Sequence, residues 1–128
     1  MTKIKIIFNL FGDTFDMEQC NKIIGLQATK IREKEKEGEH KVIYKETSWS
    51  YTLTTNQYEL ELLSNKLINL FDKKKYDILE FKNKNNLTVK VDIIFFIENE
   101  IVPSLFLNKD FLSFLNFFES EVDIDGYI

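Results

Sequence analysis

Hydrophobic and polar residues alternate most regularly between Leu87 and Asn99, and this stretch predicts the central strand of a sheet. Successive side chains of a strand point to opposite faces. One face is apolar throughout and carries Val89, Val91, Ile93, Phe95 and Ile97. The other is apolar only in its middle and carries Thr88, Lys90, Asp92, Ile94, Phe96 and Glu98. We therefore expect a sheet with one buried face and one partly open face.

The N-terminal part of the chain predicts a strand followed by a short helix. Lys3 to Phe11 alternates with its apolar positions on one face, and Gly12-Asp13-Thr14 interrupts the alternation. Asp16 suits the N-cap of the helix, with Gln19 three residues later as in a capping box. Gly25 suits the position just after the helix ends, because glycine adopts the left-handed conformation easily.

The middle of the chain predicts an exposed excursion, a strand and a helix. Ten of the twelve residues from Lys30 to Lys41 are charged or histidine. This excursion therefore has no apolar face, and we expect a frayed helical turn or a mobile loop. Val42 to Thr54 returns to alternation and predicts a strand. Asn56 then predicts the N-cap of an amphipathic helix that ends at Lys73-Lys74-Lys75.

The C-terminal third predicts four further elements. In chain order, these are a short strand at 77–82 that forms a hairpin with the central strand, a strand at 101–107 with Pro103 suited to a sheet edge, a helix capped by Asn108 or Asp110, and a strand-like tail at 121–128. The predicted order is β-α-β-α-β-β-β-α-β. We expect a single α+β domain over residues 1–128, with a mainly antiparallel sheet and about three helices packed on one face.

Composition and charge narrow the class of protein. Apolar residues make up 44% of the chain and charged residues 30%, as in an ordinary globular domain. The net charge is −4, and the acidic residues near the C-terminus account for it, so no basic footprint for nucleic acid is present. No apolar run is long enough for a membrane span, no signal peptide is recognisable, and Cys20 is the only cysteine. These features predict a cytoplasmic protein, and abundant Lys, Asn, Ile and Phe suit a bacterial source.

Candidate chemistry is sparse in this sequence. Glu121 to Gly126 opens like a calcium-binding loop, but such a loop needs a glutamate at its twelfth position and the sequence ends at Ile128. His40 is the only histidine and lies in the charged excursion, so the set of ligands that zinc requires is missing. Cys20, on the apolar side of the first helix, is interpreted as a buried inert thiol. We predict no metal site and no cofactor.

Several short motifs occur together in a familiar order. They are Phe11-Gly12-Asp13-Thr14-Phe15-Asp16, Gly25-Leu26-Gln27-Ala28-Thr29, Gly38-Glu39, Ser48-Trp49, and Val122-Asp123-Ile124-Asp125 with Tyr127. This ordered set resembles a small bacterial family, number 4279 in the domain-of-unknown-function series. Ala28 and Gly126 depart from the family pattern, which more often has proline and an aliphatic residue there. The resemblance covers nearly the whole chain and implies a shared fold. It implies no particular activity and no catalytic residue.

The preferred functional hypothesis is a non-enzymatic binding or interaction module. Ile94 and Phe96 stand on a predicted sheet face that is otherwise polar, and an exposed apolar patch flanked by charge marks a contact surface. The partner would be another protein or a second copy in a weak homodimer. Immunity proteins, which neutralise a basic toxin, provide an analogy for a small acidic bacterial domain.

The alternative hypothesis is a small-molecule-binding or hydrolytic protein. Its cleft would be lined by the Gly12–Thr14 turn, with Gly12 and Asp13, by Trp49, and by the C-terminal pair Asp123 and Asp125. A turn between a strand and a helix can present N–H groups to an anion. Two carboxylates can act as acid and base when their environments separate their pKa values. Trp49 can also be a core residue, and core packing is the favoured interpretation of this tryptophan.

Overall fold

The structure is a computed structural model that describes residues 2–128, apart from the side chain of His40. Its elements in chain order are β1 (Lys3–Gly12), α1 (Met17–Ile24), β2 (Lys30–Arg32), the 3-10 helix η1 (Glu39–Lys41), β3 (Thr47–Thr55), α2 (Leu60–Phe71), the 3-10 helix η2 (Asp72–Lys74), α3 (Lys75–Lys84), β4 (Thr88–Phe96), α4 (Lys109–Phe117) and β5 (Glu121–Tyr127).

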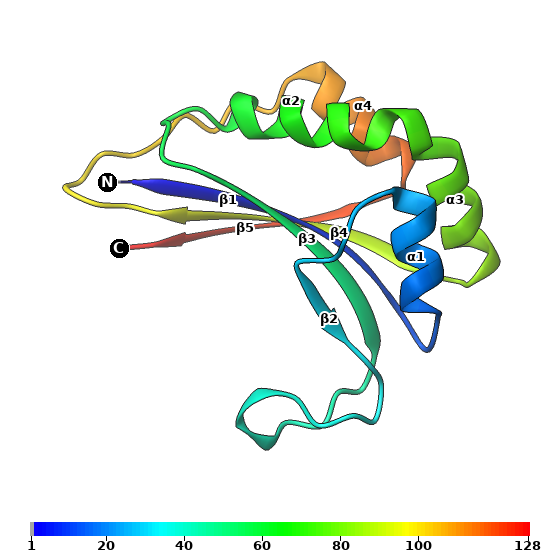
Figure 1. The fold of residues 1–128 in the computed structure, drawn as a ribbon. Coiled ribbons are helices and arrows are strands. Elements are labelled where there is room, and N and C mark those ends of the chain that lie inside the picture. The colour runs from blue at the N-terminus through cyan, green and yellow to red at the C-terminus, as the bar shows by residue number, and fades with distance from the viewer. Residues whose placement is uncertain (1) are drawn as a thin grey trace.

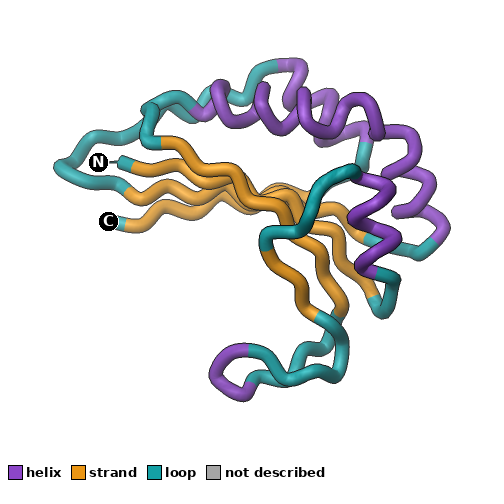
Figure 2. Tube along the Cα trace, viewed as in Figure 1, coloured by secondary structure: helices purple, strands orange, loops and turns teal. Residues whose placement is uncertain are grey.

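The five strands form one sheet in the order β2-β3-β1-β4-β5. All neighbouring strands are antiparallel except β4 and β5, which are parallel and connected through α4. The four α-helices lie on one face of the sheet, and within the described residues the other face is covered by no α-helix (Figures 1 and 2). This arrangement confirms the predicted α+β class, the mainly antiparallel sheet and the helices gathered on one face.

Aromatic side chains form the centre of the core between the sheet and the helices. Phe8 on β1 lies 4.5 Å from Phe71 of α2 and 6.2 Å from Phe114 of α4, measured between ring centroids. Phe118, just after α4, lies 5.8 Å from Phe8 in an edge-to-face arrangement. Such ring pairs stabilise a core beyond the area that they bury. One alternating set of apolar residues on each strand points into this layer, as the alternation predicts. The set is Ile4, Ile6, Phe8 and Leu10 on β1, and Val89, Val91, Ile93 and Phe95 on β4.

The helix caps that the sequence predicts at Asp16, Gly25 and Asn108 are confirmed. The Asp16 carboxylate accepts a hydrogen bond from the Gln19 N–H at 2.9 Å, and Gly25 ends α1 with φ of 80°. The Asn108 side chain accepts from the Phe111 N–H at 2.8 Å and begins α4. The prediction of Asn56 as a cap is wrong, because α2 begins three residues later, after Glu59.

Two strand predictions in the second half of the chain are wrong. Residues 77–82 belong to α3, where Ile78 and Phe81 face the core at helical spacing. A spacing of three residues is close to the helical period and therefore fits a helix. The Asn-rich segment 83–86, predicted as a hairpin turn, instead contains the end of α3. Residues 101–107 form a connection without a strand of their own, except for one bridge between Ser104 and Glu59.

The charged excursion is exposed over most of its length, as predicted, but it contains a strand that the sequence reasoning missed. Lys30–Arg32 pairs with β3 at the edge of the sheet, opposite Ser48, Trp49 and Ser50. The segment then projects below the sheet with η1 at its far end (Figure 1). Strand β3 begins at Thr47, later than the predicted Val42. We call residues 33–46 the arm.

Candidate functional site

The helix-free side of the sheet, which we call the open face, carries the candidate site. Strand registry places rows of side chains across this face, and one row runs from Ser50 on β3 through Asn9 on β1 and Lys90 on β4 to Glu121 on β5. Most strand residues on this face are partly exposed, while their neighbours in sequence are buried under the helices. The open face is therefore polar in its centre and accessible to solvent.

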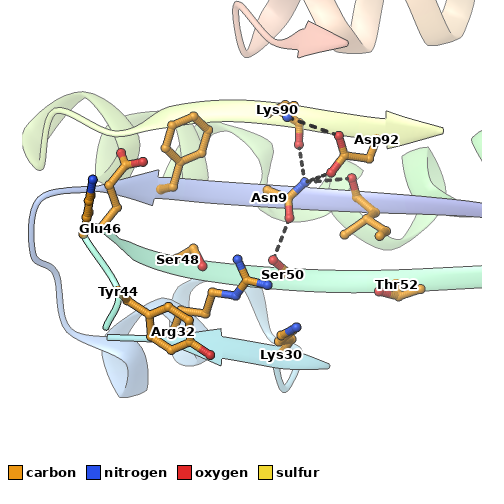
Figure 3. A pocket seen from close by; sticks show the side chains of 13 residues that line it. Asn9, Lys30, Arg32, Tyr44, Glu46, Ser48, Ser50, Thr52, Lys90 and Asp92 are labelled. Carbon is orange, nitrogen blue, oxygen red and sulfur yellow. Dashed lines mark hydrogen bonds and ion pairs between the residues drawn. The ribbon is translucent and has the colours of Figure 1, made fainter. Parts of the chain in front are cut away.

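A hollow of about 460 Å³ lies where the open face meets the arm (Figure 3). Its floor is formed by strands β1, β3 and β4, and its wall by β2 and the arm residues 44–46. This volume falls within the range of small-molecule sites in proteins. Basic residues outnumber acidic ones in its lining, with Lys30, Arg32, Lys45 and Lys90 against Glu46 and Asp92.

Asn9 holds the floor of the hollow together. Its amide nitrogen donates to the Lys90 carbonyl at 3.0 Å and to the Asp92 carboxylate at 3.0 Å, and also to the Ile7 carbonyl at 3.3 Å (Figure 3). Its amide oxygen accepts from the Ser50 hydroxyl at 2.6 Å. These bonds connect three strands through one side chain, so the floor is held rigid before any ligand arrives.

Lys90 lies between two carboxylates at the β4–β5 boundary. Its ammonium group is 2.7 Å from the Asp123 carboxylate and 3.5 Å from that of Asp92. The hydrogen bond to Asp123 is the main cause that raises the pKa of Lys90 above its ordinary value, and partial burial opposes the rise. Lys90 therefore stays charged at neutral pH, and it serves as a fixed cation and not as a base.

Arg32, the only arginine in the sequence, stands in the wall of the hollow. Its guanidinium carbon lies 5.3 Å from the centroid of the Tyr44 ring, at a distance typical of cation–π contacts. No carboxylate in the described part of the chain forms an ion pair with Arg32. In Figure 3 the guanidinium extends over β3, on the side of Ser48 and Ser50. A positioned guanidinium without an acidic partner is suited to a ligand carboxylate.

An aromatic pair occupies the other end of the open face. The rings of Phe96 and Tyr127 stack with centroids 5.7 Å apart, and the Lys5 ammonium lies 5.4 Å from the Phe96 centroid. Phe96 is 36% exposed, and Ile94 on the same face is partly exposed. The two residues predicted as a partner surface thus lie on the open face, and Tyr127 extends the patch onto β5.

The five residues predicted to line a cleft do not converge. Trp49 is fully buried on the helix side, where its indole nitrogen donates to the Asn21 side chain at 2.7 Å. Asp123 and Asp125 lie on β5 in register with Asp92 and Ile94, on the open face. Trp49 and the acidic pair therefore lie on opposite faces of the sheet and do not line one cleft.

Gly12 and Asp13 lie away from the acidic pair, at the far end of β1. A Cβ atom on Gly12 would meet the Leu87 side chain at 2.7 Å, so close packing explains this glycine. Asp13 forms an ion pair with Lys34 of the arm. These contacts give both residues structural roles in this fold.

Sequence reasoning missed the residues of the hollow itself. Asn9, Ser48 and Ser50 are polar residues in strands whose apolar and polar positions alternate. From the sequence, this alternation indicates only that such residues face solvent. Arg32 stood in a run of charges interpreted as an excursion. The sequence did contain one signal for Arg32. All the remaining Lys or Arg positions are lysine, and arginine occurs only here.

Two absences apply to the part of the chain that the structure describes. Within residues 2–128, no three His, Cys, Asp or Glu side chains gather in a way that could hold a metal ion. The described helices also include none with the length and hydropathy needed to cross a bilayer.

Comparison with known proteins gives a family and no characterised relative. No curated protein and no solved structure matches the chain. One family matches residues 2–128, which is nearly the entire chain, and it is described as a domain of unknown function, DUF4279. This coverage, on the fold described above, shows that the chain belongs to the DUF4279 family.

Proposed function

We propose that the chain is a non-enzymatic binding module that holds another protein on its open face, in the cytoplasm of a bacterium. The observation that carries the proposal is a sheet face without helices that combines an aromatic patch with a hollow of about 460 Å³. The patch consists of Ile94, Phe96 and Tyr127, and we call it the aromatic patch. Aromatic side chains and arginine are the residues enriched at the centres of protein interfaces.

The charges of the open face support a protein partner with both signs of charge. Lys30 and Arg32 lie at the β2 edge, whereas Glu121, Asp123 and Asp125 lie at the β5 edge. Such an arrangement orients a partner of complementary pattern and disfavours others. Immunity proteins remain an analogy for this kind of role and supply no further residue assignment.

The test compares variants of the open face with a matched variant elsewhere. Affinity capture from the native host would use the parent chain, Phe96→Lys, and Leu62→Lys. Leu62 lies on α2, away from the open face, and is 49% exposed, so its replacement makes a similar change on another surface. A protein captured by the parent and by Leu62→Lys, lost with Phe96→Lys, and bound again as a purified pair supports the proposal. A partner that binds all three alike refutes it.

A second copy of the chain is the simplest alternative partner. The aromatic patch would then cover itself in a weak homodimer, as a two-fold interface allows. Sedimentation at high micromolar concentration distinguishes the cases, because self-association through the patch is lost in Phe96→Lys and retained in Leu62→Lys. A parent chain that stays monomeric leaves the patch to a different protein.

Small-molecule binding is the second candidate function, and Arg32 favours it. Its guanidinium has no acidic partner in the described chain, and the Ser48 hydroxyl lies in the same lining. We propose a ligand carboxylate for this position, because arginine binds carboxylates in a bidentate manner.

Titration with succinate, followed by amide NMR shifts, tests this second candidate. Shifts at 30–32 and 48–50 that vanish in Arg32→Gln support it. Lys36→Gln is the matched control, since Lys36 lies on the arm and pairs with Glu33. Equal shifts in Arg32→Gln and Lys36→Gln would show that succinate responds only to general positive charge.

A further inference from the structure

Strand β5 lies at one end of the sheet, and no other strand of the described residues pairs with its outer backbone edge. All seven of its residues are exposed, whereas the strand at the opposite edge, β2, has only three residues. Natural sheets usually shorten, cover or distort such an edge because unpaired N–H and C=O groups accept another strand. The β5 edge is long and regular. It adjoins the aromatic patch at Tyr127, but the backbone groups on its outer side belong neither to that patch nor to the hollow.

The backbone groups that face outward can be assigned from one hydrogen bond. The Tyr127 carbonyl accepts from the Ile97 N–H at 2.7 Å, so Tyr127 directs its backbone groups toward β4. In a strand, the N–H and C=O of one residue point to one edge, and those of the next residue point to the other. Val122, Ile124 and Gly126 therefore direct their N–H and C=O groups away from the sheet.

The side chains of β5 give this edge two different faces. Glu121, Asp123 and Asp125 lie on the open face with Lys90, Asp92 and Ile94. Val122 and Ile124 lie on the helix side, yet they remain 37% and 47% exposed. No basic side chain of the described residues forms an ion pair with Glu121 or Asp125.

We propose that the β5 edge binds an extended peptide segment that adds a sixth strand to the sheet and alternates basic with apolar residues. The backbone of the segment would pair with Val122, Ile124 and Gly126. Its lysine or arginine side chains would lie beside the carboxylates, and its apolar side chains beside Val122 and Ile124. Strand addition of this kind takes affinity from backbone hydrogen bonds and specificity from alternate side chains.

A second copy of β5 fits this edge poorly. A two-fold axis perpendicular to the sheet would place the acidic faces of both strands on the same side. Carboxylates would then lie opposite carboxylates, and like charges directly across a strand pair are destabilising. The same charge pattern that excludes a second copy favours a basic segment.

The experiment uses a capped six-residue peptide that alternates lysine with valine, and a matched peptide that alternates glutamate with valine. NMR titration of the chain should show binding of the lysine peptide, with amide shifts concentrated at Val122, Ile124 and Gly126. The glutamate peptide should not bind. Raising the salt concentration should weaken binding, because the carboxylates are exposed.

Two variants at one position test the backbone pairing. Gly126→Pro removes an outward N–H and places the proline ring at the edge, so binding should weaken at least about tenfold. Gly126→Ala keeps the N–H and meets no atom within 4 Å, so it should bind like the parent. Circular dichroism checks that both variants fold.

Three results would overturn the assignment of this edge. They are no binding of the lysine peptide at about 1 mM, equal binding by Gly126→Pro and Gly126→Ala, and shifts centred outside β5. Phe96→Ala removes the ring and adds no charge beside the carboxylates, so it should leave peptide binding unchanged. Failure of the edge can then be distinguished from failure of the aromatic patch.

Discussion

Replacing Phe95 and Phe96 one at a time tests the two-sided character of β4. These residues are neighbours in sequence, but their side chains lie on opposite faces of the sheet. Phe95 is 4% exposed and packs into the core, whereas Phe96 is 36% exposed on the open face. The same change to alanine should therefore cost very different amounts of stability.

The magnitudes follow from what each ring contacts. Phe95→Ala removes a buried ring and leaves a cavity, which costs about 3–5 kcal/mol of unfolding free energy. Phe96→Ala loses the stack on Tyr127, worth about 0.5–1.5 kcal/mol, together with part of the burial of the ring. We expect a total of about 1–2 kcal/mol for Phe96→Ala.

Urea denaturation followed by fluorescence of Trp49 measures both losses. With a slope of about 2 kcal/mol per molar urea, Phe95→Ala should lower the midpoint by about 1.5–2.5 M and Phe96→Ala by less than about 1 M. Equal shifts at unchanged slope would show that both faces of β4 are buried. The open face, and the proposals that depend on it, would then be wrong.

Three further predictions concern single contacts. Burial raises the pKa of the Cys20 thiol to about 12, so a thiol reagent at pH 8 should modify it only as the chain unfolds; rapid labelling of the folded chain would contradict this. Asn21→Ala leaves the buried Trp49 indole N–H without its acceptor and should cost about 1–3 kcal/mol in urea melts, whereas Asn21→Asp keeps an acceptor and should cost less. The carboxylates of Asp123 and Asp92 raise the pKa of Lys90 above 10.5 in the folded chain. The stability that this ion pairing contributes is therefore complete below pH 10.5, and it is lost as the pH rises through the pKa of Lys90 in the folded chain. Lys90→Met should therefore lose less stability than the parent between about pH 9 and 12, and parallel losses would contradict the contact with Asp123.

Sequence reasoning succeeded where one physical signal dominated. The apolar alternation of β1 and β4 reflects burial on one face, and the caps at Asp16 and Asn108 reflect local hydrogen bonds. The strands and the helix starts can therefore be predicted from a few neighbouring residues. It failed at α3, where a short apolar stretch has the length of a strand and only the three-residue spacing of Ile78 and Phe81 indicates a helix. Local propensity could not settle that choice.

The candidate site was harder to predict because its residues are distant in the chain. Asn9, Ser50 and Lys90 meet only after three strands pair, and no local pattern distinguishes them from ordinary solvent-facing residues. Trp49 allowed two interpretations in the sequence, a core residue or the wall of a cleft, and its complete burial confirms the core interpretation. The face of a strand residue depends on register, and register is set by the whole sheet.

The position of β1 in the sheet limits how early the chain can fold during synthesis. This first strand lies between β3 and β4, and its ladder with β4 joins Lys3 to Phe96. One side of β1 must therefore stay unpaired until β4 has left the ribosome. Contacts so distant in sequence slow folding and leave apolar strands transiently exposed. We expect nascent chains that lack β4 to remain sensitive to protease and to recruit chaperones.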